Sequence, residues 1–179
     1  ALRSGNYYLD GDYTMSSSIC IAPGATVNLC LNGYKLTVNT RAFNPNGNLN
    51  ICDCSTHETG SVYANTTSST APILYSYSGS KVNFYGGTFS AAASTKREFA
   101  GCIAVGNDMG LYDVDINDDG KHTDTDKLAA EVNFYGGKFI GTEGAPIYTK
   151  VTGSGTLKVK ADNNIFLEDK ASTALIICC

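Results

Sequence analysis

The sequence predicts an all-β solenoid, in which parallel coils of three short strands each stack on one another. The string at 82–89, Val-Asn-Phe-Tyr-Gly-Gly-Thr-Phe, returns almost unchanged at 132–139. The chain is rich in Gly, Ser, Thr, Asn and Tyr, which favour turns and strands, and few stretches show helical periodicity. Shorter versions of the repeat occur elsewhere in the chain. A unit too small to bury its own apolar face is typical of a solenoid.

The first strand of each coil is identified by an alternating pattern. These strands begin at Val27, Leu49, Val82, Val132 and Leu157. Apolar and polar or mixed positions alternate, and this period of two places one strand face in a core. The second position, mostly Asn, is expected to form a hydrogen-bonded ladder, with a ligand site as the alternative. The fourth position changes from Cys to Tyr, and Tyr85 and Tyr135 are expected to stack, with a sugar platform as the alternative.

The remaining elements follow in chain order. Residues 1–26 contain short strands separated by turns at 10–12 and 22–24. Second strands are expected at 36–38, 62–64, 89, 139–140 and 165–167, and third strands at 71–75, 101–105, 145–148 and 173–177. The coil starts are 22, 33, 50 and 25 residues apart, so the longer units carry insertions that become loops on one edge. Residues 1–179 therefore form a single domain of about five to six coils. An up-and-down barrel or sandwich, with antiparallel strands joined by hairpins, is the alternative, but it gives no reason for matching columns at every third strand.

Three runs resemble a known family. They are 5–9 (Gly-Asn-Tyr-Tyr-Leu), 22–36 (from Ala-Pro-Gly-Ala-Thr-Val-Asn-Leu-Cys to Leu) and 47–54 (Gly-Asn-Leu-Asn-Ile-Cys-Asp-Cys). Together they are similar to the start of right-handed parallel β-helix domains of the pectin-lyase-like superfamily. These domains occur in secreted or cell-surface proteins of gut-type Gram-positive bacteria. The resemblance covers nearly the whole chain and implies a right-handed β-helix. The resemblance does not indicate which activity the chain has, because the superfamily includes lyases, hydrolases, adhesins and structural modules.

The longest insertion, at 107–130, is expected to be a calcium-binding loop. From Asp115 the chain matches the twelve-residue pattern with oxygen ligands at positions 1, 3 and 5, Gly at 6 and a carboxylate at 12. The expected ligands are Asp115, Asn117, Asp119, the carbonyl of Lys121, Thr123 and Asp126. Asp126 replaces the usual Glu and resembles the dockerin variant, but one loop without flanking helices does not favour cohesin binding. A structural Ca²⁺ is expected, and a solvated acidic loop is the alternative.

Composition restricts the setting and the partners. The net charge is −4 and no basic patch is present, so a nucleic acid partner is not expected. No apolar run approaches the roughly 20 residues that span a membrane. Seven cysteines in such a polar chain favour an oxidising, extracellular or cell-surface location. Their odd number leaves at least one thiol free or paired between molecules.

The cysteine positions predict particular pairings. Cys30 and Cys52 share a column on consecutive coils, where strands about 4.8 Å apart allow a disulfide. Two stacked free thiols are the alternative, Cys54 has no obvious partner, and a zinc site is disfavoured by the one-residue gap between Cys52 and Cys54. Cys20 belongs to the third-strand column of the first coil, and Cys178 and Cys179 to that of the last. These ends meet only if molecules stack head to tail, which predicts a cross-linked fibre.

The residues do not favour an enzyme. The face formed by the first strands offers Asn, Cys, Tyr and Lys, and Asp53 is its lone carboxylate, whereas lyases and hydrolases of this kind need an arginine base or clustered carboxylates there. His57 and His122 fall in predicted loops. The expected function is that of a non-enzymatic extracellular structural protein that self-associates. The alternatives are an adhesion or carbohydrate-binding module with a glycan or host-surface ligand, and a polysaccharide lyase or glycoside hydrolase.

Overall fold

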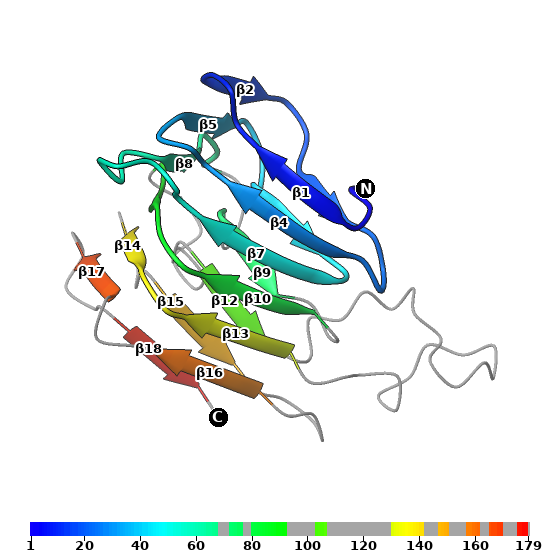
Figure 1. The fold of residues 1–179 in the computed structure, drawn as a ribbon. Coiled ribbons are helices and arrows are strands. Elements are labelled where there is room, and N and C mark those ends of the chain that lie inside the picture. The colour runs from blue at the N-terminus through cyan, green and yellow to red at the C-terminus, as the bar shows by residue number, and fades with distance from the viewer. Residues whose placement is uncertain are drawn as a thin grey trace.

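The computed structural model describes residues 1–67, 72–76, 80–92, 103–106, 130–141, 147–150, 157–161, 165–169 and 175–178. Within these residues the protein is all-β and contains no helix (Figure 1). The strands follow one another in chain order from the N-terminal end of the molecule to the C-terminal end. The all-β prediction is therefore confirmed.

The strands form three parallel sheets of six strands each, and every strand pairs with the strand three places along the chain. The first sheet contains β1 (Gly5–Tyr8), β4 (Thr26–Cys30), β7 (Asn48–Cys52), β10 (Lys81–Phe84), β13 (Ala130–Phe134) and β16 (Leu157–Ala161). The second contains β2 (Tyr13–Met15), β5 (Lys35–Val38), β8 (Ser61–Ala64), β11 (Thr88–Ala91), β14 (Gly137–Gly141) and β17 (Ile165–Asp169). The third contains β3 (Ile19–Ile21), β6 (Phe43–Pro45), β9 (Leu74–Ser76), β12 (Ile103–Gly106), β15 (Ile147–Lys150) and β18 (Leu175–Cys178). Parallel pairing in all three sheets contradicts the antiparallel alternative.

The strand register confirms most of the predicted columns and corrects one. Val82 lies opposite both Leu49 and Val132, as the repeat predicts. The last strand is shifted: Leu157 lies opposite Ala130, and Val159 takes the place opposite Val132 that was expected for Leu157. The alternating Leu-Lys-Val-Lys pattern looks the same after a shift of two residues, so it does not fix the position along the strand.

The sequence predicts short strands within residues 1–26, of which β1 is one, but it does not predict β6. β1 lies next to β4 and extends its columns, with Asn6 opposite Asn28 and Tyr8 opposite Cys30. β6 pairs with β3, with Pro45 opposite Ile21. The edge of the first sheet is therefore one strand closer to the N-terminus than the repeat alone indicated.

The core lies between the three sheets and is filled by the inward-facing positions of their strands. Val27, Leu49 and Val82 are fully buried in consecutive strands. Phenylalanine replaces aliphatic residues in later strands. The Phe84 ring stacks on Phe134 with centroids 5.4 Å apart, and it contacts Phe89 and Phe139 edge-on at 4.9 and 5.2 Å. Burying each such ring stabilises the fold by about 1.5–3 kcal/mol.

Glycines make the corner between the first and second sheets. Gly33, Gly87 and Gly137 follow β4, β10 and β13 and have φ values of 80°, 103° and 111°. Side chains other than that of glycine are disfavoured in this region. Packing adds a second constraint, because a Cβ atom on the adjacent Gly136 would lie 2.6 Å from the carbonyl oxygen of Tyr85. The Gly-Gly pair of the repeat is thus required by the corner.

Candidate functional site

The Asn column on the outer face of the first sheet forms a continuous hydrogen-bonded ladder. Each Nδ2 donates to the Oδ1 of the preceding Asn, at 2.7 Å from Asn28 to Asn6 and at 2.7 Å from Asn50 to Asn28. The ladder continues at 2.6 Å from Asn83 to Asn50 and at 2.7 Å from Asn133 to Asn83. The predicted ladder is confirmed, and its amides satisfy one another along the column.

An ion pair lies on the same face of the first sheet as the ladder. The Nζ of Lys81 lies 2.9 Å from the Oε1 of Glu131, and the same carboxylate oxygen accepts a 2.9 Å hydrogen bond from Asn133. The hydrogen bond and charge of Glu131 raise the pKa of Lys81. Asn83 and Asn133 are only 8 % and 6 % exposed, whereas Asn28 is exposed. The ladder is therefore desolvated at one end and solvated at the other.

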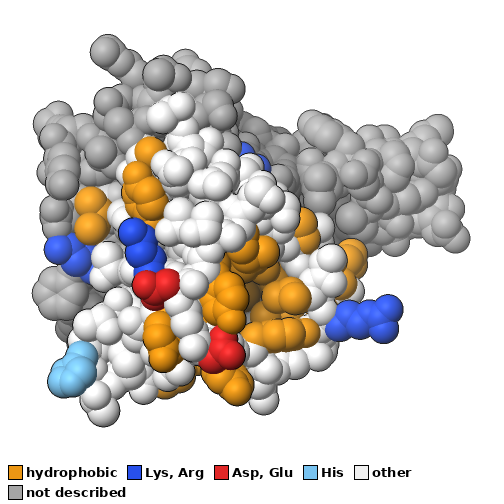
Figure 2. Space-filling view, turned by 90° about the horizontal axis from the view of Figure 1, so that it is seen from above, with side chains coloured by type: hydrophobic (Ala, Val, Ile, Leu, Met, Phe, Trp, Pro, Cys, Tyr) orange, Lys and Arg blue, Asp and Glu red, His pale blue; other side chains and the backbone are white. Residues whose placement is uncertain are grey.

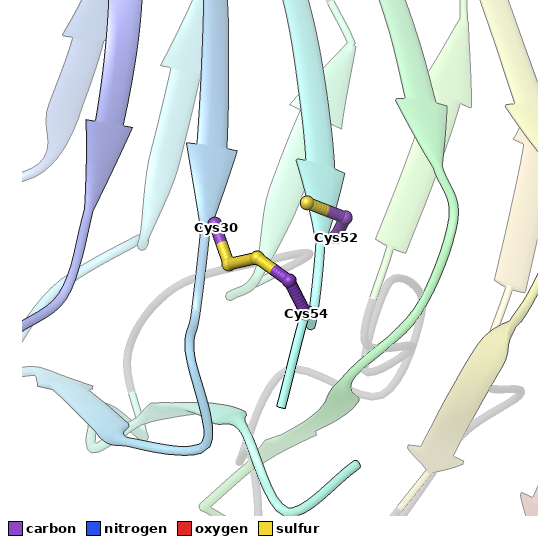
Figure 3. Close-up of side chains that lie close together, drawn as sticks. All are labelled: Cys30, Cys52 and Cys54. Atoms are coloured by element: carbon purple, nitrogen blue, oxygen red, sulfur yellow. A yellow bond between two sulfur atoms is a disulfide. The ribbon is translucent and has the colours of Figure 1, made fainter. Parts of the chain in front are cut away.

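Three cysteines gather next to the ladder, at the ends of β4 and β7 (Figure 3). Cys30 forms a disulfide with Cys54, and their Cα atoms lie 6.2 Å apart. Cys52 is a free thiol, although it lies directly opposite Cys30 in the sheet. The predicted Cys30–Cys52 disulfide is thus replaced by Cys30–Cys54. Residues 52 and 54 point to the same side of an extended chain, so either can approach Cys30 from this face.

The free thiol of Cys52 is held beside this disulfide. It donates a weak hydrogen bond of 3.7 Å to the carbonyl oxygen of Leu29, the residue before Cys30. The sulfur atoms of the three cysteines all lie within 4.8 Å of one another. Desolvation, together with the negative charge of Asp53, raises the pKa of the Cys52 thiol. The group can exchange disulfides, and it could hold a thiophilic metal ion only after the Cys30–Cys54 bond had been reduced.

Asp53 joins two loops together. Its Oδ1 accepts hydrogen bonds from the backbone N–H groups of Gly33 at 2.8 Å and Ser55 at 3.2 Å. Its Oδ2 accepts from the N–H of Gly60 at 2.5 Å and from the hydroxyl of Ser55 at 3.1 Å. Burial opposes ionisation of this carboxyl, but the hydrogen bonds from Gly60, Gly33 and Ser55 outweigh burial and lower its pKa. The lone carboxylate of the face formed by the first strands is therefore occupied in a structural role.

Tyr85 and Tyr135 border a hollow on the surface of the corner. Their rings stack with centroids 5.0 Å apart and an interplanar angle of 8°, as predicted. The hollow has a volume of about 380 Å³, and Glu58 and Lys138 also contribute to its lining. Tyr85 is 52 % exposed. An aromatic edge beside charged groups and glycine backbone is suited to a hydroxyl-rich ligand.

A second, more apolar hollow lies at the N-terminal end. It has a volume of about 460 Å³, and partly buried Leu2, Leu9 and Ile19 are among the residues that line it. Figure 2, which looks onto this end, shows hydrophobic side chains gathered over it. Tyr8 stands at the hollow and is 71 % exposed. This end of the molecule has the character of an interface rather than of a solvated surface.

The cysteines expected between molecules lie in the third sheet, as far as the structure describes them. Cys20 lies in β3, its side chain is half-buried, and Cys178 lies in β18 at the opposite edge of that sheet. The strand register connects Ile19 through four intermediate strands to Leu175, so Cys20 shares its column with Ile176 and not with Cys178. Cys179 lies outside the described residues.

The predicted calcium loop lies outside the described residues, including its ligands Asp115, Asn117, Asp119, Lys121, Thr123 and Asp126. His122 also lies outside them, and His57 is an exposed loop residue. The hydrogen bonds of Asp53 and the free state of Cys52 were not foreseen. No local pattern signals the first, because the donors Gly33 and Gly60 lie 20 and 7 residues from Asp53.

No helix in the described part of the chain is long and apolar enough to cross a membrane. Comparisons with protein-family models, with curated proteins and with solved structures found no match to this chain.

Proposed function

We propose that this chain is a non-enzymatic extracellular structural protein, a right-handed parallel β-helix that self-associates head to tail. The observation that carries the proposal is the N-terminal end, where an apolar hollow of about 460 Å³ adjoins the open edges of β1 and β2. The edge of β3 is bridged by Leu2, which pairs with Ile21. Open strand edges beside apolar surface are templates for further parallel strands. The occupant we propose is the C-terminal end of a second copy.

The direction of the Asn ladder supports head-to-tail association. Every amide donates toward the N-terminal end, and the ladder ends at Asn6, whose Nδ2 has no acceptor among the described residues. A second copy that presented its own N-terminal end would oppose donor to donor. A copy that presents its C-terminal end continues the direction of the strands and forms an open, polymerising contact.

Stacking of this kind does not need a disulfide. Leu2 already bridges the edge of β3, and its N–H group donates to the carbonyl oxygen of Cys20, so this sheet does not pass directly to a second copy. If Leu2 were displaced and the strand register continued across the junction, Cys20 would face Ile176, and the Cα atom of Cys178 would lie about 8 Å away, beyond the range of a disulfide. We therefore propose a non-covalent junction, in which the predicted cross-link through Cys20 forms only after a shift of two residues. The Cys30–Cys54 disulfide supports an oxidising, extracellular setting.

Calcium belongs to the proposal as a structural ion. The pattern from Asp115 to Asp126 supports a loop in which oxygen ligands organise an insertion with little apolar material. We expect a chelator to lower the melting temperature of the protein and added Ca²⁺ to restore it. The Asp119→Ala variant should show neither change, and a chelator-insensitive wild-type protein would refute the calcium assignment.

Self-association is tested by sedimentation velocity over a range of concentrations. The Tyr8→Glu variant places a charge at the N-terminal hollow and should shift the protein toward monomer. Tyr34→Glu is the matched control, because Tyr34 is also exposed but does not line the hollow. We expect reductant to leave the association unchanged. A wild-type monomer at all concentrations, or equal effects of the two variants, would refute the proposal.

One observation favours a second function, that of a carbohydrate-binding or adhesion module. The hollow beside Tyr85 and Tyr135 combines aromatic surface with the charged groups of Glu58 and Lys138. Binding of the Tyr8→Glu protein to a glycan array, lost in the additional Tyr85→Ala variant, would support this function. Absence of binding to every glycan tested would leave only the structural function.

A further inference from the structure

We propose that Cys30, Cys52 and Cys54 form a thiol–disulfide exchange site, in which Cys52 displaces Cys54 from Cys30 and the released Cys54 then reacts with an external disulfide. The external ligand is a small aliphatic disulfide. This inference is independent of self-association and of glycan binding.

The geometry of the sheet provides the nucleophile. Cys52 and Cys30 are directly opposed in neighbouring parallel strands, and all three sulfur atoms lie within 4.8 Å of one another. In Figure 3 the Cys52 thiol points from its own strand toward the strand that carries Cys30. Its hydrogen bond to Leu29 holds it there. The attacking atom is thus already placed beside the bond that it would break.

Both disulfides are compatible with the fold. The Cα atoms of Cys30 and Cys54 lie 6.2 Å apart, and strand neighbours such as Cys30 and Cys52 lie about 4.8 Å apart, so both pairs fall in the disulfide range. The two cross-links close loops of nearly equal length, because the sequence separation is 24 residues for one and two residues fewer for the other. Loop-closure entropy therefore favours neither pairing.

The exchange needs no net oxidant. The Cys52 thiol loses its proton, and the thiolate attacks the sulfur of Cys30. A Cys30–Cys52 bond forms, the Cys30–Cys54 bond breaks, and Cys54 leaves as a thiolate that can take up a proton. Cys54 then attacks one sulfur of the external disulfide, which forms a mixed disulfide and releases one external thiolate.

The exposure of the two cysteines determines which thiol can reach an external disulfide. Cys54 is exposed and Cys52 is half-buried, so displacement moves the reactive thiol from a sheltered position to the surface. Burial and the neighbouring Asp53 charge raise the pKa of Cys52, so its attack on Cys30 depends on its placement beside the disulfide, while its burial limits direct contact with external reagents. An external disulfide therefore reacts with Cys54 in preference to Cys52.

The test locates the modified cysteine. The oxidised wild-type protein is incubated at low concentration with cystine at pH 8, quenched with acid, and blocked with N-ethylmaleimide. A protease that cleaves before Asp53 separates Cys52 from Cys54, and mass spectrometry identifies the cysteinylated peptide. We expect cysteinylation mainly at Cys54, together with a Cys30–Cys52 cross-linked peptide. Cysteinylation of Cys52 alone, with only Cys30–Cys54 cross-linked, would overturn the proposal.

Two variants complete the design. Cys52→Ser removes the nucleophile and should reduce cysteinylation of Cys54 to background. Cys20→Ser removes a different half-buried free thiol, in β3, and should leave the cysteinylation of Cys54 unchanged. Persistence of Cys54 modification in Cys52→Ser would show attack by another thiol and would refute the assigned nucleophile. The wild-type result decides the question by itself if Cys52→Ser does not fold.

Discussion

Replacing one ladder asparagine at a time should show how much of the ladder's stability comes from burial. Asn28 and Asn83 each donate one ladder hydrogen bond and accept another, with donor–acceptor distances of 2.6–2.7 Å. They differ in environment, since Asn28 is exposed and Asn83 is 8 % exposed. We expect Asn28→Ala to lower the free energy of unfolding by about 0.5–1 kcal/mol, because water replaces the lost partners.

The buried position should be more sensitive. In Asn83→Ala the amide of Asn133 keeps its bond to Glu131, whereas the Oδ1 of Asn50 loses its donor. The variant loses two hydrogen bonds and leaves one acceptor poorly hydrated, so its free energy of unfolding should fall by roughly 2–3 kcal/mol.

Urea unfolding of the oxidised proteins measures both losses. With an m-value of about 2 kcal/mol/M, the midpoint should fall by about 1–1.5 M for Asn83→Ala and by less than about 0.5 M for Asn28→Ala. The substitution is the same in both variants, so differences in strand propensity largely cancel. Equal midpoint shifts would refute the reasoning, because they would mean that bond number rather than desolvation determines the contribution.

Three further predictions concern the core, the Asp53 carboxylate and the corner. Phe84→Ala should lower the unfolding free energy by about 3–5 kcal/mol in urea, whereas the exposed Tyr85→Ala should lower it by less than about 1 kcal/mol; similar losses would contradict the core assignment. Asp53→Asn should destabilise the protein at neutral pH. Because the folded-state pKa of Asp53 is lowered, its contribution is present above about pH 5 and is lost as the pH falls through the folded-state pKa, so the unfolding curves of wild type and Asp53→Asn should converge in acid. A difference independent of pH would show that the charge is not responsible. Gly136→Ala should lower the melting temperature, because its Cβ would meet the Tyr85 carbonyl, while Gly11→Ala, with no atom within 4 Å of the new Cβ, should not; the reverse order would contradict the close approach at the corner.

The sequence indicated which face of each strand is buried but not always the position along the strand. Apolar alternation correctly placed Val27, Leu49 and Val82 in the core, and the Asn positions in a ladder. Two differences between prediction and structure are shifts of two residues along the chain. Leu157 is shifted by two residues, and Cys54 takes the place expected for Cys52, two residues away.

A period of two explains these disagreements. A shift of two residues leaves every side chain on the same face, so the hydrophobic pattern cannot detect it. Only contacts with the neighbouring strand and the following loop decide between the two positions. For the cysteines, the hydrogen bonds of Asp53 fix the chain immediately after β7, which is a tertiary constraint that no local pattern reveals.

The ladder spacing has a consequence for how the molecule tolerates change. Asn28 and Asn50 are 22 residues apart and Asn83 and Asn133 are 50 apart, yet the hydrogen bonds have the same length of 2.7 Å. Lengthening a connection from 22 to 50 residues adds only about 0.7 kcal/mol of loop-closure entropy. Foreign segments grafted between β12 and β13 should therefore be accepted without disturbing the strands, which makes this protein a candidate display scaffold.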